Sequence, residues 1–171
     1  MRNIAVGDKK INQEAGMKHN LVRAGLVIAS FWIAGMLPLQ AQCSLGSVAG
    51  NWAYTYTGTI FTNAGPLPAA AVGHFKLDRS GNINGGQTFT LAGQTEAEDI
   101  SGTLTVNSDC TGTATVQVFV NAQLQRTTAL AVAFDNNANH TRAIFQSVVL
   151  PDGTNLPVVV TFDGSRITTR D

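Results

Sequence analysis

Hydrophobic and polar residues alternate along most of the chain after Cys43, and this period of two predicts β-strands. The clearest example is GNWAYTYTGTI, in which Trp52, Tyr54 and Tyr56 alternate with small or hydroxyl-bearing residues. Successive side chains of a strand point to opposite faces of a sheet, so such a segment buries one face and leaves the other in water. No stretch after Cys43 keeps a helical period over a useful length. The pattern therefore predicts an all-β domain.

Turn sequences rich in Gly, Pro, Asn and Asp divide this pattern into eight runs. The runs cover residues 48–60, 70–78, 82–91, 94–107, 112–121, 124–135, 139–150 and 155–163. Several connections are short enough for hairpins, so runs that follow one another in sequence are expected to pair antiparallel. We predict an eight-stranded antiparallel up-and-down β-barrel, because closure removes the exposed sheet edges. A β-sandwich is the alternative.

Most runs have one apolar face and one face rich in Thr and Asn, as expected for a barrel in water. The residues predicted to face inward are Trp52, Tyr54, Tyr56, Ile60, Phe75, Leu77, Ile83, Phe89, Leu91, Ile100, Leu104, Val106, Val116, Val118, Val120, Leu130, Val132, Phe134, Ile144, Val148, Leu150, Val158, Val160 and Phe162. The same alternation places His74 on the outer face and Arg142 in phase with the interior, with a plug or rim role near the end where the first run begins.

The first 41 residues are organised like a secretory signal peptide. Lys18 and Arg23 precede the apolar run AGLVIASFWIAGMLPL, and the small Ala41 ends a cleavage-like LQA. Met17 is an alternative start, because the segment before it is long and polar. The apolar run is shorter than the roughly 20 residues that a membrane span needs, which disfavours a retained anchor. We expect residues 42–171 to form one secreted or periplasmic domain that does not stay in the membrane.

Two cysteines, Cys43 and Cys110, follow the predicted cleavage site. An even number of cysteines in an exported protein predicts a disulfide. In an up-and-down barrel both residues fall at the same end, although a sandwich could also accommodate the bond. His74 and His140 have no metal-ligating partner nearby in the sequence, so neither a metal nor another cofactor is expected.

Charge and motifs exclude several functional classes. Residues 42–171 carry nine acidic and six basic side chains without clusters. They contain no basic cluster that could bind a phosphate backbone or an anionic membrane, so we expect no nucleic-acid partner. The segment has neither the G-x-S-x-G elbow of serine hydrolases nor a glycine-rich loop followed by Lys and Ser or Thr.

The sequence Gly50, Asn51, Trp52 resembles the G-x-W signature of lipocalins, whose Trp plugs the closed end of an eight-stranded barrel. The following TNAGPLPAAA, residues 62–71, lies where lipocalins carry a lid over the open end. The short strands and turns are also similar to compact secreted bacterial barrels of the allene oxide cyclase-like type, within the calycin-like group. The resemblance covers residues 46–163 and implies a plug role for Trp52. The later lipocalin motifs and the C-terminal helix have no counterpart here. No catalytic residue is carried over from the cyclases, because they do not align with this chain residue by residue.

Three charged residues lie in phase with the interior near the predicted mouth, the end opposite Trp52. They are Glu96, Glu98 and Arg126. A carboxylate and a guanidinium inside a barrel can orient a polar ligand, and a desolvated carboxylate can gain a pKa suited to proton transfer. Glu98 and Arg126 are therefore the candidate catalytic residues. The simpler alternative is a solvated contact at the rim, worth about 0–1 kcal/mol.

Three functions fit these features. We favour binding of a small apolar ligand in the lumen, entering past the Pro-rich segment. A filled barrel that acts as an extracellular interaction protein is the second, because eight strands leave an interior only just wide enough for side chains or one small ligand. A cyclase or isomerase in which the barrel folds its substrate is the third. The residues predicted to contact a ligand are Trp52, Tyr54, Tyr56, Phe75, Phe89, Glu96, Glu98, Arg126 and Phe134.

Overall fold

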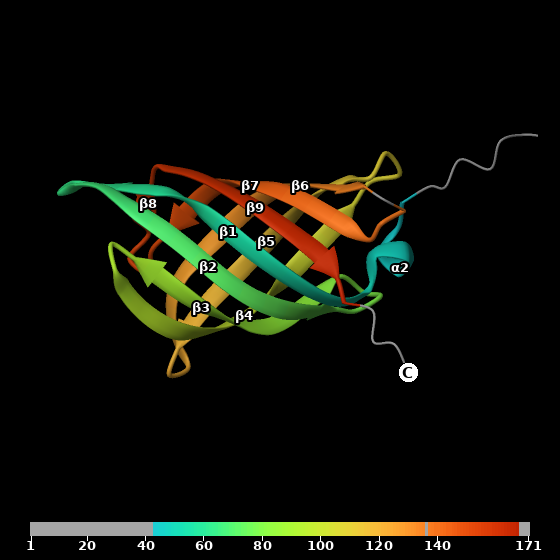
Figure 1. The fold of residues 1–171 in the computed structure, drawn as a ribbon, viewed down its shortest axis with the longest axis horizontal. Coiled ribbons are helices and arrows are strands. Elements are labelled where there is room, and N and C mark those ends of the chain that lie inside the picture. Colours follow the sequence, from blue (N-terminus) through green and yellow to red (C-terminus); the bar gives the residue numbers. More distant parts are fainter. Residues whose placement is uncertain (1–42, 136, 168–171) are drawn as a thin grey trace, which may run out of the picture. The chain divides into compact units, whose positions relative to one another are not determined.

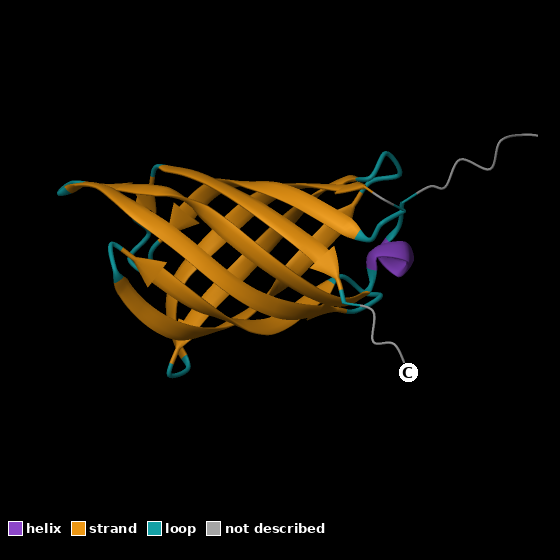
Figure 2. Ribbon diagram, in the orientation of Figure 1, coloured by secondary structure: helices purple, strands orange, loops and turns teal. Residues whose placement is uncertain are grey.

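The computed structural model describes residues 43–135 and 137–167, which form one short helix and nine strands (Figures 1 and 2). The elements are α2 (Leu45–Val48), β1 (Gly50–Thr62), β2 (Gly65–Leu77), β3 (Asn82–Leu91), β4 (Gln94–Val106), β5 (Thr111–Val120), β6 (Gln123–Asp135), β7 (His140–Val149), β8 (Asn155–Leu156) and β9 (Val158–Arg166). The predicted signal peptide, residues 1–41, lies outside the described residues.

Eight of these strands close into one antiparallel barrel. Each strand from β1 to β7 pairs with the next, and β9 pairs with both β7 and β1. The two-residue β8 only extends the edge of β7. The predicted eight-stranded antiparallel up-and-down barrel is thus confirmed, and the sandwich is excluded because the sheet closes on itself.

The Pro-rich segment predicted to form a lid is part of a strand instead. β1 and β2 pair over their whole lengths, so that Asn63 and Ala64 alone form the turn between them. Proline is tolerated here because β2 extends past the end of β3. The carbonyl of Pro68 accepts from the backbone N–H of Ala92 at 2.9 Å, just beyond the last β2–β3 pair. The missing N–H of Pro68 faces that same side, where it costs no hydrogen bond of the ladder.

The predicted inward face of β7 is wrong over its first half, because this strand has a bulge. Its register against β6 shifts between Ala129 and Leu130, which leaves Gln146 as an extra residue. An extra residue reverses the alternation of side chains. Ile144 and Arg142 consequently face outward, and the side chain of Arg142 is 68% exposed. In the other strands, the predicted apolar face is the buried one.

Helix α2 lies at the end of the barrel at which β1 begins (Figure 1), and Trp52 contacts it there. Ser44 and Ser47 cap this short helix reciprocally, a feature that the sequence pattern did not predict. Trp52 is fully buried, and its indole N–H donates to the carbonyl of Val48 at 3.0 Å. Its ring stacks on Phe75, with 6.2 Å between the ring centroids. Trp52 therefore has the plug position that the lipocalin resemblance implies.

A disulfide joins Cys43 to Cys110, as predicted, and fastens the start of α2 to the turn between β4 and β5. It spans 67 sequence positions. In the chain-entropy model, closing a loop of this length stabilises the fold by about 4 kcal/mol. A structural disulfide is typical of an oxidising compartment. Among the residues described here, no helix is long and apolar enough to cross a membrane.

Candidate functional site

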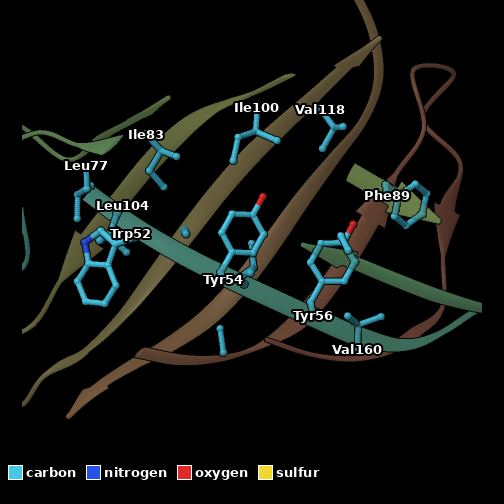
Figure 3. Close-up of a cluster of buried hydrophobic side chains, with 14 of the residues drawn as sticks. Trp52, Tyr54, Tyr56, Leu77, Ile83, Phe89, Ile100, Leu104, Val118 and Val160 are labelled. Atoms are coloured by element: carbon cyan, nitrogen blue, oxygen red, sulfur yellow. The ribbon is translucent and has the colours of Figure 1, made fainter. Parts of the chain in front are cut away.

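Five buried polar side chains form a hydrogen-bonded group inside the barrel, which we call the polar cluster. Its members are Tyr54 and Tyr56 from β1, Gln87 from β3, Glu98 from β4 and Arg126 from β6. Each of these residues as a whole is at most 9% exposed. Both tyrosine rings project from β1 to the same side, away from the Trp52 end (Figure 3). The cluster thus brings together residues that are up to 72 positions apart in the sequence.

The strand register explains why Tyr54, Gln87 and Glu98 lie at one level of the barrel, on β1, β3 and β4. Tyr54 pairs with Gly73 on β2, Gly73 pairs with Gln87, and Gln87 pairs with Glu98. Gly73 leaves room for the tyrosine to cross β2. A Cβ added to it would lie 2.8 Å from Cζ of Tyr54 and 2.7 Å from Cβ of Gln87, closer than real Cβ atoms approach. The row therefore depends on a glycine at position 73.

Glu98 and Arg126 form a buried ion pair with two parallel hydrogen bonds. Nη1 of Arg126 donates to Oε1 of Glu98 at 2.6 Å, and Nη2 donates to Oε2 at 2.7 Å. Nε2 of Gln87 donates to the same Oε2 at 2.5 Å. A buried charge is tolerated only when it is paired and hydrogen-bonded in this way. The two charges cancel, so the cluster as a whole is neutral.

The guanidinium of Arg126 also contacts an aromatic ring. Its guanidinium carbon lies 4.3 Å from the centroid of the Phe89 ring, within cation–π distance. Burial alone lowers the pKa of Arg126, but the hydrogen bonds that Arg126 donates to Glu98 and the proximity of Tyr56 and Glu98 raise it by more. Arg126 therefore stays charged.

Burial also raises the pKa of both tyrosines. For Tyr54 the neighbouring Tyr56 and Glu98 raise it further, while Arg126 opposes them. For Tyr56 burial outweighs the lowering effect of Arg126. Both hydroxyls are consequently neutral at physiological pH and can donate hydrogen bonds.

A cavity of about 80 Å³ extends from the polar cluster toward the closed end of the barrel. Its wall is mostly apolar, with side chains such as Phe75, Ile100, Leu130 and Phe162. Tyr54, Tyr56, Gln87 and Arg126 of the polar cluster supply most of its polar groups, and Thr128 and Thr141 add two hydroxyls. The interior is therefore neither completely filled nor an open channel.

The structure distributes the nine predicted ligand contacts over three environments. Tyr54, Tyr56, Phe75, Arg126 and Phe134 line the cavity. Trp52 belongs to the plug, Phe89 covers Arg126, and Glu98 lies behind Arg126, so these three are buried outside the cavity wall. Glu96 is exposed. The alternative of a solvated rim contact between Glu98 and Arg126 is wrong, because their side chains are only 2% and 11% exposed.

Sequence reasoning missed three polar residues of this site, Gln87, Thr128 and Thr141. Thr128 lies between Arg126 and Leu130 at even spacing, so the alternation could have placed it inside. Gln87 follows Ile83 and precedes Phe89 at even spacing, so the alternation alone could have placed it inside. The inward direction of Thr141 could not be predicted from the sequence, because the bulge in β7 reverses the alternation on which such a prediction rests.

Neither a protein-family model nor a curated protein matches the chain. Among solved structures it is similar to a redesigned β-barrel, mFAP1, bound to DFHBI, with 16% identity, 72% of this chain and 98% of that chain covered, and a TM-score of 0.47. It is also similar to the S-type phycobiliprotein lyase CPES from Guillardia theta, with 8% identity, 79% and 99% covered, and a TM-score of 0.45. These similarities concern the fold alone.

The burial of both tyrosines can be tested by titration, because the chain has just two tyrosines. We expect the folded protein to show no phenolate absorbance as the pH passes 10, where an unperturbed tyrosine titrates. The chain unfolded in urea will titrate there. Since the folded pKa values are the higher ones, their contribution to stability is present below pH 10 and is lost as the pH rises above it. A normal phenolate titration in the folded protein would contradict this burial.

A double-mutant cycle measures the buried ion pair. Glu98→Gln or Arg126→Met alone leaves an uncompensated buried group, so each should lower the free energy of unfolding by about 3–5 kcal/mol. The double variant should cost clearly less than the sum of the two. As the matched control, Arg142→Met removes the exposed pair with Asp135 and should change stability by about 0–1 kcal/mol. Additive effects of the first two substitutions in urea unfolding would show that the pair is not coupled.

Proposed function

We propose that the protein binds a small, mostly apolar molecule inside the barrel, in the cavity beside the polar cluster. The observation that carries this proposal is the combination of an apolar cavity, closed at one end by Trp52, with a few polar side chains that converge on it. Binding sites for small molecules typically combine these features. The apolar wall would hold the body of the ligand, and the polar cluster would orient it.

The cavity volume limits the size of the ligand. At about 80 Å³ it exceeds the about 10–15 Å³ that one water molecule requires. It is well below the about 300–1,000 Å³ of pockets that enclose drug-sized ligands. It is also about half of the about 150 Å³ of an apolar cavity that binds benzene. The best-fitting occupant is thus a molecule smaller than a benzene ring.

The chemistry of the polar cluster favours binding over proton transfer. Both carboxylate oxygens of Glu98 are occupied by Arg126 and Gln87, so this carboxylate is not free to act as a base. The tyrosines hold their protons, because burial raises the pKa of each. These contacts suit a group that positions a ligand, and they favour a binding protein over the cyclase-like alternative.

Ligand binding can be measured with small apolar probes such as isobutene. A probe at 100 times its Kd should raise the free energy of unfolding by about 2.7 kcal/mol. Ala114→Leu places extra volume in the cavity wall and should weaken binding at least about tenfold, since a filled cavity leaves the probe no space. Ala53→Leu adds the same volume on the exposed face of β1 and should leave binding unchanged.

Mass spectrometry of an extract of the unfolded protein identifies any molecule that copurifies with it. Failure of every probe to bind, together with an empty extract, would favour the filled barrel that acts through its surface. Binding that is equally strong in Ala114→Leu would place the site elsewhere.

A further inference from the structure

Two buried side-chain atoms lack a hydrogen-bond partner among residues 43–135 and 137–167. They are Oγ1 of Thr141 and Nε of Arg166. Arg166 lies over the ring of Trp52 at the plug, outside the cavity wall. Thr141 is part of the cavity wall and is 2% exposed. A buried hydroxyl without a partner is costly, so a ligand atom that bonds to Thr141 would recover stability that the empty protein lacks.

The strand register places Thr141 at the closed end of the cavity. Thr141 pairs with Phe134 on β6, and the ring of Phe134 packs edge-on against Trp52 with 5.8 Å between the centroids. Thr128, the other threonine of the wall, precedes Phe134 by six positions on β6. At about 3.3 Å per residue the two positions are about 20 Å apart along the strand. Thr141 is thus well separated from Thr128 and from the neighbouring Arg126 of the polar cluster.

The side chains around Thr141 are apolar. Its methyl group occupies the space beside Gly164, its partner on β9, where an added Cβ would lie 2.9 Å from Cγ2 of Thr141. The ring of Phe162 borders the same space, and Ala143 is the next inward residue on β7. The hydroxyl of Thr141 is consequently a single polar group in an apolar part of the cavity.

Such a place suits a molecule with one polar atom better than it suits water. A buried water typically makes about three hydrogen bonds, and the side chains beside Thr141 supply one. A small hydrocarbon that carries one oxygen can bond to Thr141 and still contact the apolar wall. The groups of the polar cluster largely bond one another, so Thr141 is the wall residue that gains most from such a ligand.

The charges in the barrel favour a neutral ligand. Arg126 is the charged residue of the cavity wall, and two hydrogen bonds match its charge to that of Glu98. An ionic ligand would lose its water without gaining a free counter-charge, which is costly in a buried site.

We infer that the ligand of this cavity is a neutral short-chain ketone or alcohol, smaller than benzene, whose oxygen accepts a hydrogen bond from the hydroxyl of Thr141. This inference rests on the proposed function, because it names the chemical class of the molecule bound in the same cavity. The hydrocarbon part of the ligand contacts Phe134 and Phe162.

The test uses acetone and isobutene, which have nearly the same shape and differ in an oxygen against a CH2 group. Thr141→Val should weaken the binding of acetone about 3- to 10-fold, the effect of one lost hydrogen bond. It should change the Kd of isobutene less than about twofold, because Val has the shape of Thr. Thr141→Ser keeps the hydroxyl and should bind acetone as the unaltered protein does. Thr128→Val is the matched control, and it should affect the two probes equally.

The outcomes separate this inference from the proposed function. If both probes bind and Thr141→Val weakens both equally, or neither, then the cavity binds ligands and the role of Thr141 is overturned. A selective loss of acetone binding in Thr128→Val would place the oxygen near the polar cluster and would also overturn it. If neither probe binds the unaltered protein, the proposed function fails and the inference fails with it.

The stability of the empty protein gives a second test that needs no ligand. Val at position 141 buries no hydroxyl, so Thr141→Val should lower the equilibrium constant of unfolding about fivefold or more. A variant that is less stable than the unaltered protein would show that the hydroxyl already has a partner inside the empty barrel. That result would overturn the inference and leave the proposed function standing.

Discussion

The width of an eight-stranded barrel is the constraint on which the rest of this structure depends, because that interior is only just wide enough for side chains or one small ligand. β1 sends three aromatic side chains into this space, from Trp52, Tyr54 and Tyr56 (Figure 3). The neighbouring strands make room with small residues. At Gly73 a Cβ would collide with Tyr54, and at Gly85 it would lie 2.1 Å from the carbonyl oxygen of His74. The cavity is the space that remains after this exchange of large and small residues.

The same constraint explains why charged groups can lie so deep in the barrel. Glu98 on β4 and Arg126 on β6 lie on either side of β5, close enough for two short hydrogen bonds, and Phe89 covers the guanidinium. An apolar core of equal volume is often at least as stable as a buried ion pair. The polar cluster therefore need not add to stability, which agrees with the proposal that it orients a ligand. Trp52 and α2 at one end, and this cluster toward the other, define the two boundaries of the site.

Much of this architecture could be predicted from alternation alone, since a half-buried strand must place its apolar residues at every second position. That rule identified the eight barrel strands and most of their inward faces, and the paired cysteines gave the disulfide. It failed where the backbone departs from regularity. The bulge in β7 reversed the directions of the Arg142 and Ile144 side chains. The prolines of β2 were mistaken for a lid because proline usually marks a loop, and the sequence does not show that β2 continues past the end of β3. Alternation placed Glu98 and Arg126 in phase with the interior. Their contact depends on the register of three strands, so only the structure shows that they form a buried pair.

The most direct test is a crystal structure of the protein under xenon pressure, because xenon enters apolar cavities that stay free of water. We predict a xenon site inside the barrel beside Phe75, Leu130 and Phe162, and we predict its loss in the Ala114→Leu variant. An interior without xenon, in which side chains fill the space between Trp52 and Tyr56, would contradict a ligand-binding lumen.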